Sequence, residues 1–369
     1  RMAKGFWAMG GEYRGRPARG KPALFRTSRR SRLRYPLPVK RGALVMLVLV
    51  LTLLIACLLR LTISGGWPDD PMVFSLRLHR IMAAVSVGAF LAIAGVILQA
   101  VMRNPLASPD VIGVSSGASL AVMLSIYLSS LGLGAVGGYL ANASWQTIPA
   151  LIGAIVVLGI LLSLTRAGHR ASPVEPTTLL LTGVVISVLC GAGVMFLQYL
   201  MPDVGFSAAR LLIGTISDDT GRLAAWLLPV VLIVVFFATL QGRTLDALSL
   251  SDDEALSVGV NIRVTRPVLL LLAGLCCALA VALAGPIGFI GLIAPHLARS
   301  FLGVANASHR LLIPAAAIVG ASIIVLADAA VKAINLGAGR MPIGIITAIV
   351  GGPMLIVLLR QSSRGSVHE

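Results

Sequence analysis

The sequence predicts an all-α, polytopic membrane protein with about ten transmembrane helices. Of its 369 residues, 57% are hydrophobic and only 12% are charged, and the mean hydropathy is +0.94. A soluble domain carries about 45–50% apolar and about 25% charged residues. The apolar residues also fall into ten runs, most of them close to the roughly 20 residues that a bilayer-spanning helix needs. These observations exclude a soluble globular enzyme, a disordered chain and a coiled coil.

The ten apolar runs are separated by polar stretches or by Gly- and Pro-rich stretches. They cover residues 42–64, 80–102, 111–131, 148–165, 177–200, 223–241, 266–284, 286–303, 311–331 and 342–360. The chain has 39 glycines and only 5% aromatic residues, which fits close helix packing through small side chains.

Two of the separating stretches are too short or too irregular to be ordinary loops. Residues 103–110 read RNPLASPD, and residues 285–291 read GPIGFIG. Irregular backbone at membrane depth is tolerated only where protein buries it or where it lines a wet cavity. We therefore expect both stretches to line a central path.

The positive charge is concentrated in an N-terminal tail. Residues 1–41 carry a net charge of +12, whereas residues 42–369 carry +4. The tail predicts a disordered cytoplasmic segment that contacts anionic lipid, and no nucleic-acid-reading module accompanies it. Ten spans place both termini, including the short C-terminal tail 362–369, in the cytoplasm. The loops then divide 23 positive charges inside from 6 outside, as the positive-inside rule requires.

The longest predicted cytoplasmic loop covers residues 242–265. Its apolar residues are Leu245, Leu248, Leu256, Val258 and Val260. Their spacing predicts two short amphipathic helices, broken near Ser251 and Gly259. Such a loop is either a docking surface for another protein or an ordinary solvated loop.

Polar residues within apolar segments are costly and mark candidate functional positions. They are Arg60, Gln99, Gln198, His296 and Asp328. We interpret Gln99, His296 and Asp328 as buried polar groups, Asp328 being a pairing or capping group rather than a proton relay. The four cysteines have no metal-ligand spacing, so no metal or cofactor is expected. The chain also lacks a GxxxxGK[ST] phosphate-binding loop.

Four blocks in order resemble the FecCD family. Residues 75–80 (SLRLHR) with 99–118 (QAVMRNPLASPDVIGVSSGA) are similar to its R-x-P-R…Q-x-x-x-x-N-P-L-A-x-P signature. The other blocks are 248–260, 284–299 (AGPIGFIGLIAPHLAR) and 326–328 (LAD) with 341–353. The resemblance covers residues 42–361.

This resemblance implies a permease subunit of a type II ABC importer, with ten helices per subunit. Its partners would be a second permease subunit, identical or paralogous, two ATP-binding cassette ATPase subunits and a periplasmic or lipid-anchored substrate-binding protein. The chain itself would be no enzyme, because the partner ATPase hydrolyses ATP. Its location would be the bacterial cytoplasmic (inner) membrane.

The resemblance also implies residue roles. Arg77, Arg80 and Lys332 would contact the substrate-binding protein. His79 occupies the position at which the family has Pro. The residues that would form the cytoplasmic gate are Asn104, Pro105, Leu106, Pro176 and Thr177. The residues that would contact the ATPase and couple it to the permease are Leu248, Leu250, Glu254, Ala255 and Gly259.

The sequence of residues 103–113 most resembles the corresponding segment of permeases for ferric siderophores, and haem and cobalamin are the alternative substrates. More distant hypotheses remain open. An ion-coupled secondary transporter would depend on Asp328, a membrane enzyme on His296, and a structural subunit on a paralogue that supplies most of the pore.

Overall fold

The computed structural model describes residues 39–63, 66–132, 147–167, 176–201, 214–216, 221–303, 308–334 and 341–365. The predicted tail 1–41 lies outside the described residues except for its last three, which begin α1. Of the predicted C-terminal tail, residues 362–365 continue the last helix and residues 366–369 lie outside the described part.

Each of the ten predicted apolar runs overlaps a helix. The long helices are α1 (Val39–Thr62), α2 (Pro71–Val101), α3 (Val114–Ser130), α5 (Thr147–Ala167), α6 (Pro176–Leu200), α8 (Gly221–Leu240), α11 (Ile262–Ala284), α12 (Ile290–Leu302), α13 (His309–Ala333) and α14 (Ile343–Gly365). Two short helices, α9 (Gly242–Leu248) and α10 (Asp252–Ser257), lie between α8 and α11. The predicted pair of helices in loop 242–265 is therefore confirmed.

Length and composition set how many of these helices can span a bilayer. Among the described residues, α1, α2, α6, α11 and α13 are long and apolar enough, and α8 with α9 forms a further candidate bent by 54°. The apolar helices α3, α5, α12 and α14 are shorter by the same measure. The bend makes α9 the redirected continuation of α8 rather than a free loop.

The start of α2 differs from the prediction. Asp70 caps the helix, because its side chain accepts a hydrogen bond of 2.8 Å from the backbone N–H of Met72, and Pro71 occupies the first turn, where its missing N–H costs nothing. The helix thus begins nine residues before the predicted boundary at residue 80. Arg77 and Arg80 consequently lie on the helix and not in a loop.

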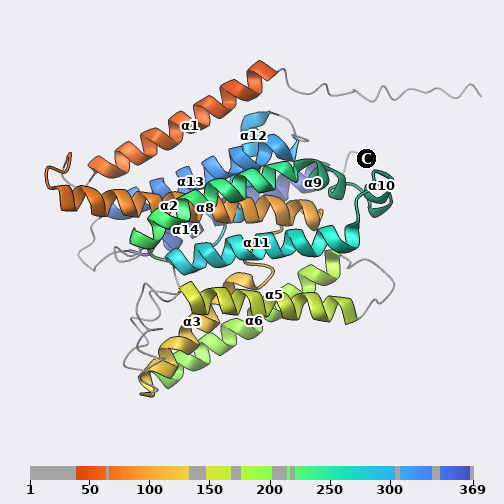
Figure 1. The fold of residues 1–369 in the computed structure, drawn as a ribbon, viewed down its shortest axis with the longest axis horizontal. Coiled ribbons are helices and arrows are strands. Elements are labelled where there is room, and N and C mark those ends of the chain that lie inside the picture. Colours follow the sequence, from red (N-terminus) through yellow and green to blue (C-terminus); the bar gives the residue numbers. More distant parts are fainter. Residues whose placement is uncertain are drawn as a thin grey trace, which may run out of the picture. The chain divides into compact units, whose positions relative to one another are not determined.

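Helix α2 is the centre of the packing. It is buried from Ile81 to Val101 except at Met82 and Val85, and it packs against α13, α11, α8 and α12. Helices α3, α5 and α6 pack on one another and join this group through α11 (Figure 1). Helix α1 packs mainly on α13 and leaves most of its surface exposed.

Glycine pairs set how closely the central helices approach. A Cβ on Gly88 of α2 would lie 2.2 Å from the carbonyl oxygen of Gly320 on α13, and a Cβ on Gly95 would lie 1.8 Å from the carbonyl oxygen of Gly291 on α12. No side chain fits at these distances. The crossings therefore depend on bare backbone, as in other close contacts between membrane helices.

The two predicted breaks are irregular, as expected. Arg103 has a φ of 50° and Gly113 a φ of 86°, so the chain between α2 and α3 passes through a series of turns. Between α11 and α12, Gly285 has a φ of 69° and Phe289 a φ of 71°. A positive φ is unusual for a residue such as Phe, which shows how strongly the surrounding helices constrain this turn.

Candidate functional site

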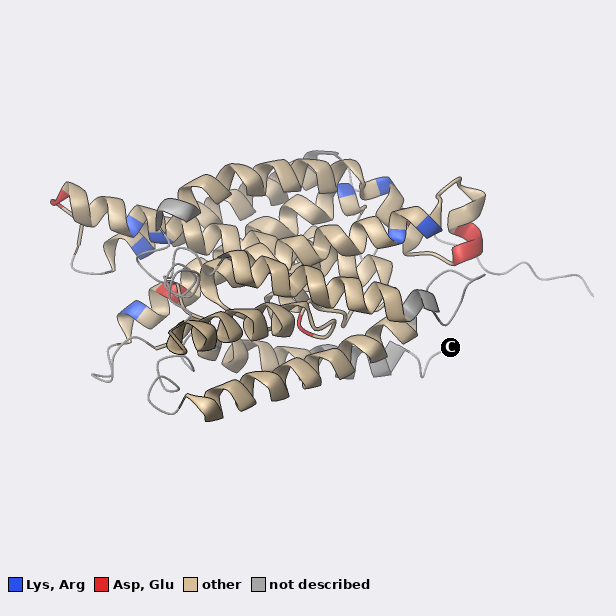
Figure 2. Cartoon of the chain, turned by 60° about the horizontal axis from the view of Figure 1, so that its bottom comes forward, with Lys and Arg blue, Asp and Glu red and all other residues tan. Residues whose placement is uncertain are grey.

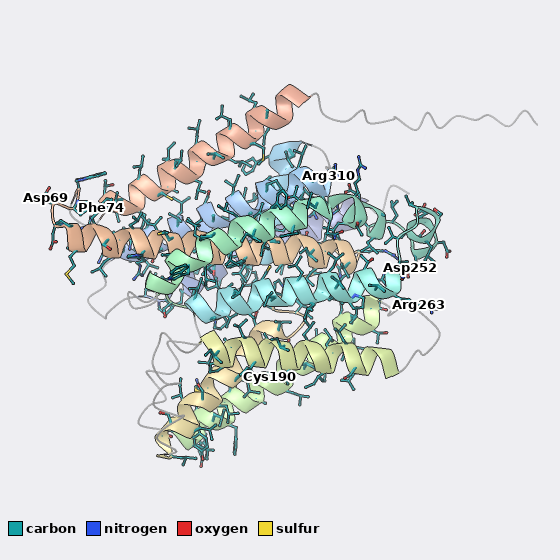
Figure 3. The ribbon with its side chains drawn as sticks, in the orientation of Figure 1. Asp69, Phe74, Cys190, Asp252, Arg263 and Arg310 are labelled. Atoms are coloured by element: carbon teal, nitrogen blue, oxygen red, sulfur yellow. The ribbon has the colours of Figure 1, made fainter. Side chains whose placement is uncertain are left out.

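The charged residues gather toward the two ends of the helices. Figure 2 shows the helix lengths between those ends almost without charge. Figure 3 places Asp252, Arg263 and Arg310 toward one end and Asp69 and Phe74 toward the other. We call the first the α9–α10 end and the second the Asp328 end.

A three-residue ion-pair cluster fastens α9 and α10 to the bundle. Arg103, just after α2, pairs with Asp252 at the start of α10, and its Nε also donates to the carbonyl of Leu248 at the end of α9 over 2.9 Å. Arg266 of α11, 2% exposed, donates to the same Asp252 over 2.9 Å. Burial raises the pKa of Asp252, but the bonds and charges of the two arginines outweigh it and leave that pKa below its usual value.

A capping box starts α10. The Ser251 hydroxyl accepts from the backbone N–H of Glu254 over 3.2 Å, and the Glu254 carboxylate accepts from the Ser251 N–H over 2.9 Å. These bonds lower the pKa of Glu254. Glu254, predicted to couple to an ATPase, is thus exposed and also holds the first turn of the helix in place.

The predicted coupling residues divide into a buried and an exposed group. Leu248 and Ala255 are fully buried inside this chain, whereas Leu250 is 50% exposed and Gly259 is exposed. The exposed apolar surface is completed by Leu256 and Val258, which are 54% and 69% exposed and were not selected from the sequence. Leu248 and Ala255 therefore support the segment from within, and the surface available to a partner is Leu250, Leu256 and Val258.

Asp246 joins α9 to the first residues of α13. One carboxylate oxygen accepts from the Ser308 hydroxyl over 2.9 Å, and the other accepts from the backbone N–H of His309 over 2.9 Å and bonds its ring Nδ1 over 2.6 Å. Burial raises the pKa of Asp246, and its bonds to His309 and Ser308 reverse this and lower it. Asp246 therefore accepts hydrogen bonds from the N-cap residue and the first residue of α13, which lie 62 and 63 residues further along the chain.

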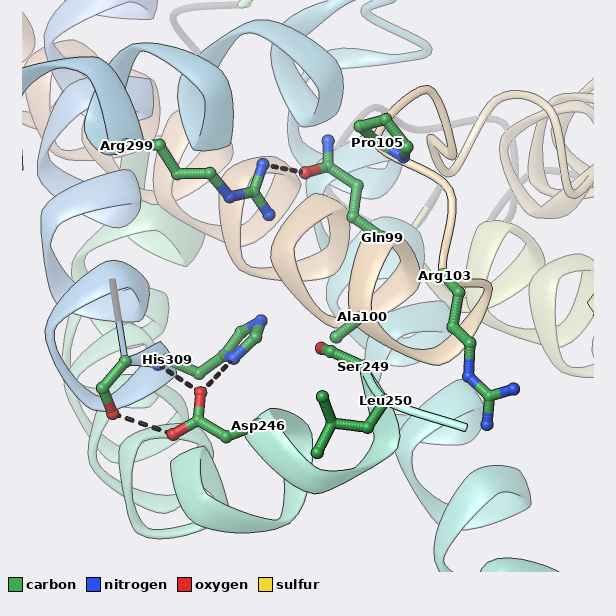
Figure 4. Close-up of a pocket in the computed structure, with 10 residues that line it drawn as sticks. Gln99, Ala100, Arg103, Pro105, Asp246, Ser249, Leu250, Arg299 and His309 are labelled. Atoms are coloured by element: carbon green, nitrogen blue, oxygen red, sulfur yellow. Dashed lines mark hydrogen bonds and ion pairs between the residues drawn. The ribbon is translucent and has the colours of Figure 1, made fainter. Parts of the chain in front are cut away.

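A pocket of about 550 Å³ lies between these groups. Its lining includes Gln99, Arg103, Asp246, Arg299 and His309 (Figure 4). The side-chain oxygen of the buried Gln99 accepts from Arg299 over 2.7 Å. His296, predicted as a buried polar group, is only half-buried, and it forms no hydrogen bond with the residues that the structure describes.

One of the residues predicted to form the cytoplasmic gate, Pro105, lines this pocket. The side chain of Asn104 accepts from the N–H of Leu106 over 2.9 Å, which closes a tight turn with Pro105 exposed at its tip. Thr177 is exposed on α6, and the Pro176 side chain lies outside the described residues. The gating role of these residues stays a prediction.

At the other end, Asp328 holds two arginines. Arg60 of α1 pairs with one of its oxygens, and Arg80 of α2 donates to it over 2.8–3.1 Å. The side chains of Arg60, Arg80 and Asp328 are 4%, 9% and 0% exposed. Asp328 is therefore buried and paired with two arginines in this structure. Arg60 is one of the polar residues within the apolar segments, but the sequence predicts no role for it, because its partner lies 268 residues away.

The three residues predicted to dock a binding protein differ in exposure. Arg80 is buried and bound to Asp328, so in this conformation its guanidinium does not face a partner. Arg77 is partly exposed and donates to the carbonyls of Leu61 and Gly66 over 2.7 and 3.0 Å. Lys332 is exposed at the end of α13. The docking role stays a prediction. Of the three residues, Lys332 and Arg77 are the ones exposed enough to contact a partner.

Asp110 has contacts for which the sequence predicts no role. Its carboxylate accepts from the Ser115 hydroxyl over 2.8 Å and from the backbone N–H of Phe289, and its carbonyl accepts from Ser187 of α6 over 3.1 Å. One residue thereby joins both irregular breaks. It was overlooked because only acids inside apolar runs were considered, whereas Asp110 lies in the break itself.

Comparison with known proteins agrees with this architecture. The model of the FecCD transport family matches residues 44–361. The chain is 37% identical over 294 residues to the hemin transport system permease protein HmuU of Yersinia pestis, covering 79% of this chain and 84% of the relative. It is 33% identical over 354 residues to the Fe(3+)-citrate import system permease protein YfmE of Bacillus subtilis, covering 88% and 97%.

A third relative, the vitamin B12 import system permease protein BtuC of Vibrio cholerae, is 37% identical over 299 residues, covering 79% of this chain and 83% of the relative. A solved metal-chelate type ABC transporter in an inward-facing conformation matches with a TM-score of 0.73 and 30% identity, over 86% of this chain and 99% of that one. The resemblance found in the sequence is confirmed, and the chain belongs to the FecCD transport family.

Proposed function

We propose that this chain is the permease subunit of an ATP-driven importer and forms the path of a ferric siderophore across the cytoplasmic membrane. The single observation that carries the importer mechanism is the α9–α10 segment. It is fastened to α2, α11 and α13 by Asp246 and Asp252, and it presents exposed Leu250, Leu256 and Val258. An apolar surface on a rigidly held segment suits a partner that pushes on the bundle.

The partners follow from the family. Two ATPase subunits would bind the α9–α10 ends of two permease subunits. On this proposal the α9–α10 end faces the cytoplasm, and so do both termini. A substrate-binding protein would dock at the Asp328 end, with Lys332 and Arg77 steering it. Exposed charges contribute little affinity, about 0–1 kcal/mol each, but they fix orientation and speed association.

The substrate class is supported by the relatives, which are named for hemin, ferric citrate and vitamin B12. Within it we choose a ferric siderophore because residues 103–113 resemble permeases of that group. Haem or cobalamin would keep the same mechanism.

The other hypotheses lack comparable support. Asp328, on which ion coupling would depend, already pairs with two arginines. His296, on which an enzyme would depend, bonds to no nucleophile among the described residues.

Uptake into proteoliposomes tests the proposal. The vesicles hold the chain with its neighbouring permease, ATPase and binding protein, and they are offered iron-labelled siderophore, haem or cobalamin with ATP inside. We expect ATP-dependent uptake of the siderophore. Uptake of haem or cobalamin alone would overturn the substrate and keep the mechanism.

The variant Leu256→Arg tests the coupling surface, with Leu256→Met as the matched control. We expect the arginine variant to elute as a folded protein but to lose the ATPase during purification and to lose uptake. The methionine variant should retain both. Normal uptake with Leu256→Arg would contradict the assignment of α9–α10 as the ATPase contact.

A further inference from the structure

The pocket at the α9–α10 end contains an arginine, Arg299, that pairs with no acidic residue in the described part of the chain. Arg299 is half-buried, and its only hydrogen bond to the described residues goes to the neutral amide of Gln99. Among the residues that the structure describes, the two other arginines buried or half-buried at this end are Arg103 and Arg266, and both pair with Asp252. A buried charge is costly unless an opposite charge accompanies it, so the surroundings of Arg299 are electrostatically incomplete.

The remaining groups of the pocket point to what would complete it. Figure 4 shows a second guanidinium nitrogen of Arg299 and the free ring nitrogen of His309 directed into the same space, whereas the guanidinium of Arg103 turns away from it. Asp246 is the one carboxylate among the described lining residues, and it already accepts three hydrogen bonds from Ser308 and His309. Its charge is therefore directed at the start of α13.

The size and walls of the pocket limit the ligand. About 550 Å³ is far more than one water needs, and it lies within the range for ligand pockets, about 300–1,000 Å³. Beside the polar groups it has apolar walls from Ala100, Pro105 and Leu250. Guanidinium groups bind phosphate oxygens with two parallel hydrogen bonds, and basic pockets between transmembrane helices bind lipid head groups.

We propose that this pocket binds a phosphate group, held by Arg299 and His309. The ligand bridges α12 and α13 next to Asp246 of α9. It therefore stiffens the junction between the bundle and the α9–α10 segment. The phosphate belongs either to an anionic phospholipid head group or to a soluble phosphate, and the two sources share the same contacts.

Binding to the delipidated full chain in a neutral detergent tests the proposal. One arm titrates inorganic phosphate, a second titrates a short-chain phosphatidylglycerol, and a third titrates the corresponding diacylglycerol, which lacks phosphate. Adducts are counted by native mass spectrometry, and thermal stabilisation is followed in parallel, since a ligand of the folded state raises its stability. We expect saturable binding in the first or second arm and none in the third.

Three variants distinguish phosphate binding in this pocket from non-specific binding to basic residues elsewhere. Arg299→Gln removes the cation, and Ala100→Leu fills the pocket while leaving every charge in place. Arg243→Gln is the matched control, because Arg243 is an exposed arginine of α9 outside the lining. We expect at least tenfold weaker phosphate binding in the first two variants and a change below twofold in the control.

Three results would overturn the proposal: binding in neither phosphate arm, equal binding by the diacylglycerol, or equal loss in Arg243→Gln. Saturation in the phosphatidylglycerol arm alone would support the site and identify the ligand as a lipid head group. Saturation by inorganic phosphate at similar concentrations would support it and identify a soluble ligand.

Discussion

Replacing Asp328 with Asn should destabilise the fold more than other single changes at that end. The substitution keeps the size of the side chain and removes its charge, which leaves Arg60 and Arg80 buried together without a carboxylate. Removing one partner of a buried ion pair costs about 3–5 kcal/mol. Because two cations depend on this single acid, we expect the upper part of that range. At about 1.4 kcal/mol per decade, this is roughly a thousandfold change in the unfolding equilibrium.

The assay is equilibrium unfolding of the purified full chain in mixed micelles at increasing SDS. Lys332→Gln is the matched control, since Lys332 is exposed one turn further along α13, and surface changes usually stay within about 0.5 kcal/mol. A triple variant with Leu at positions 60, 80 and 328 should recover most of the loss, because apolar replacement of a whole buried cluster is often neutral. A loss below about 1 kcal/mol for Asp328→Asn would refute the reasoning.

Three further predictions concern packing and α10. Gly95→Ala should destabilise the chain by about 1–3 kcal/mol or more, because the new Cβ would lie 1.8 Å from the carbonyl oxygen of Gly291. The control Gly159→Ala places its Cβ where no atom lies within 4 Å. It should be neutral or slightly stabilising in the same SDS titration. Ser251→Ala should cost about 0.5–2 kcal/mol of local stability, measured as faster hydrogen exchange of the α10 amides; unchanged exchange would exclude the capping box. The pKa of Asp252 is lowered in the folded chain. Its contribution to stability is therefore present above about pH 4 and is lost as the pH falls through that lowered pKa. Hydrogen exchange of the α10 amides, corrected for the intrinsic rate, should thus be constant from pH 5 to 8 and rise only in stronger acid.

The helices were predictable because the membrane restricts the alternatives. A chain in lipid must satisfy every backbone hydrogen bond internally, so each apolar run of sufficient length forms a helix. The short helices α9 and α10 were predictable from Ser251 and from the spacing of the apolar residues around it. The start of α2 was missed because Asp70 and Pro71, a cap and a first-turn proline, begin the helix before its apolar run does.

The pairing of charges could not be predicted from the sequence alone. Arg60 and Arg80 meet Asp328 across 268 and 248 residues, and the positions of these residues depend on how α1, α2 and α13 cross. The same holds for Asp246, which lies in the predicted loop 242–265 and accepts hydrogen bonds from Ser308 and His309 at the start of α13. Burial also decides which residues of the α9–α10 segment face outward. Leu248 and Ala255, which the sequence predicted to couple to an ATPase, are buried, whereas Leu256 and Val258 are exposed.

The measurement that tests the central claim most directly is the energy source of uptake. Proteoliposomes with the complete set of partner subunits are given either internal ATP with a protonophore or a proton gradient without ATP. The account predicts labelled ferric siderophore inside the vesicles only in the first condition, at a rate that falls to background with Leu256→Arg. Uptake driven by the gradient without ATP would contradict it.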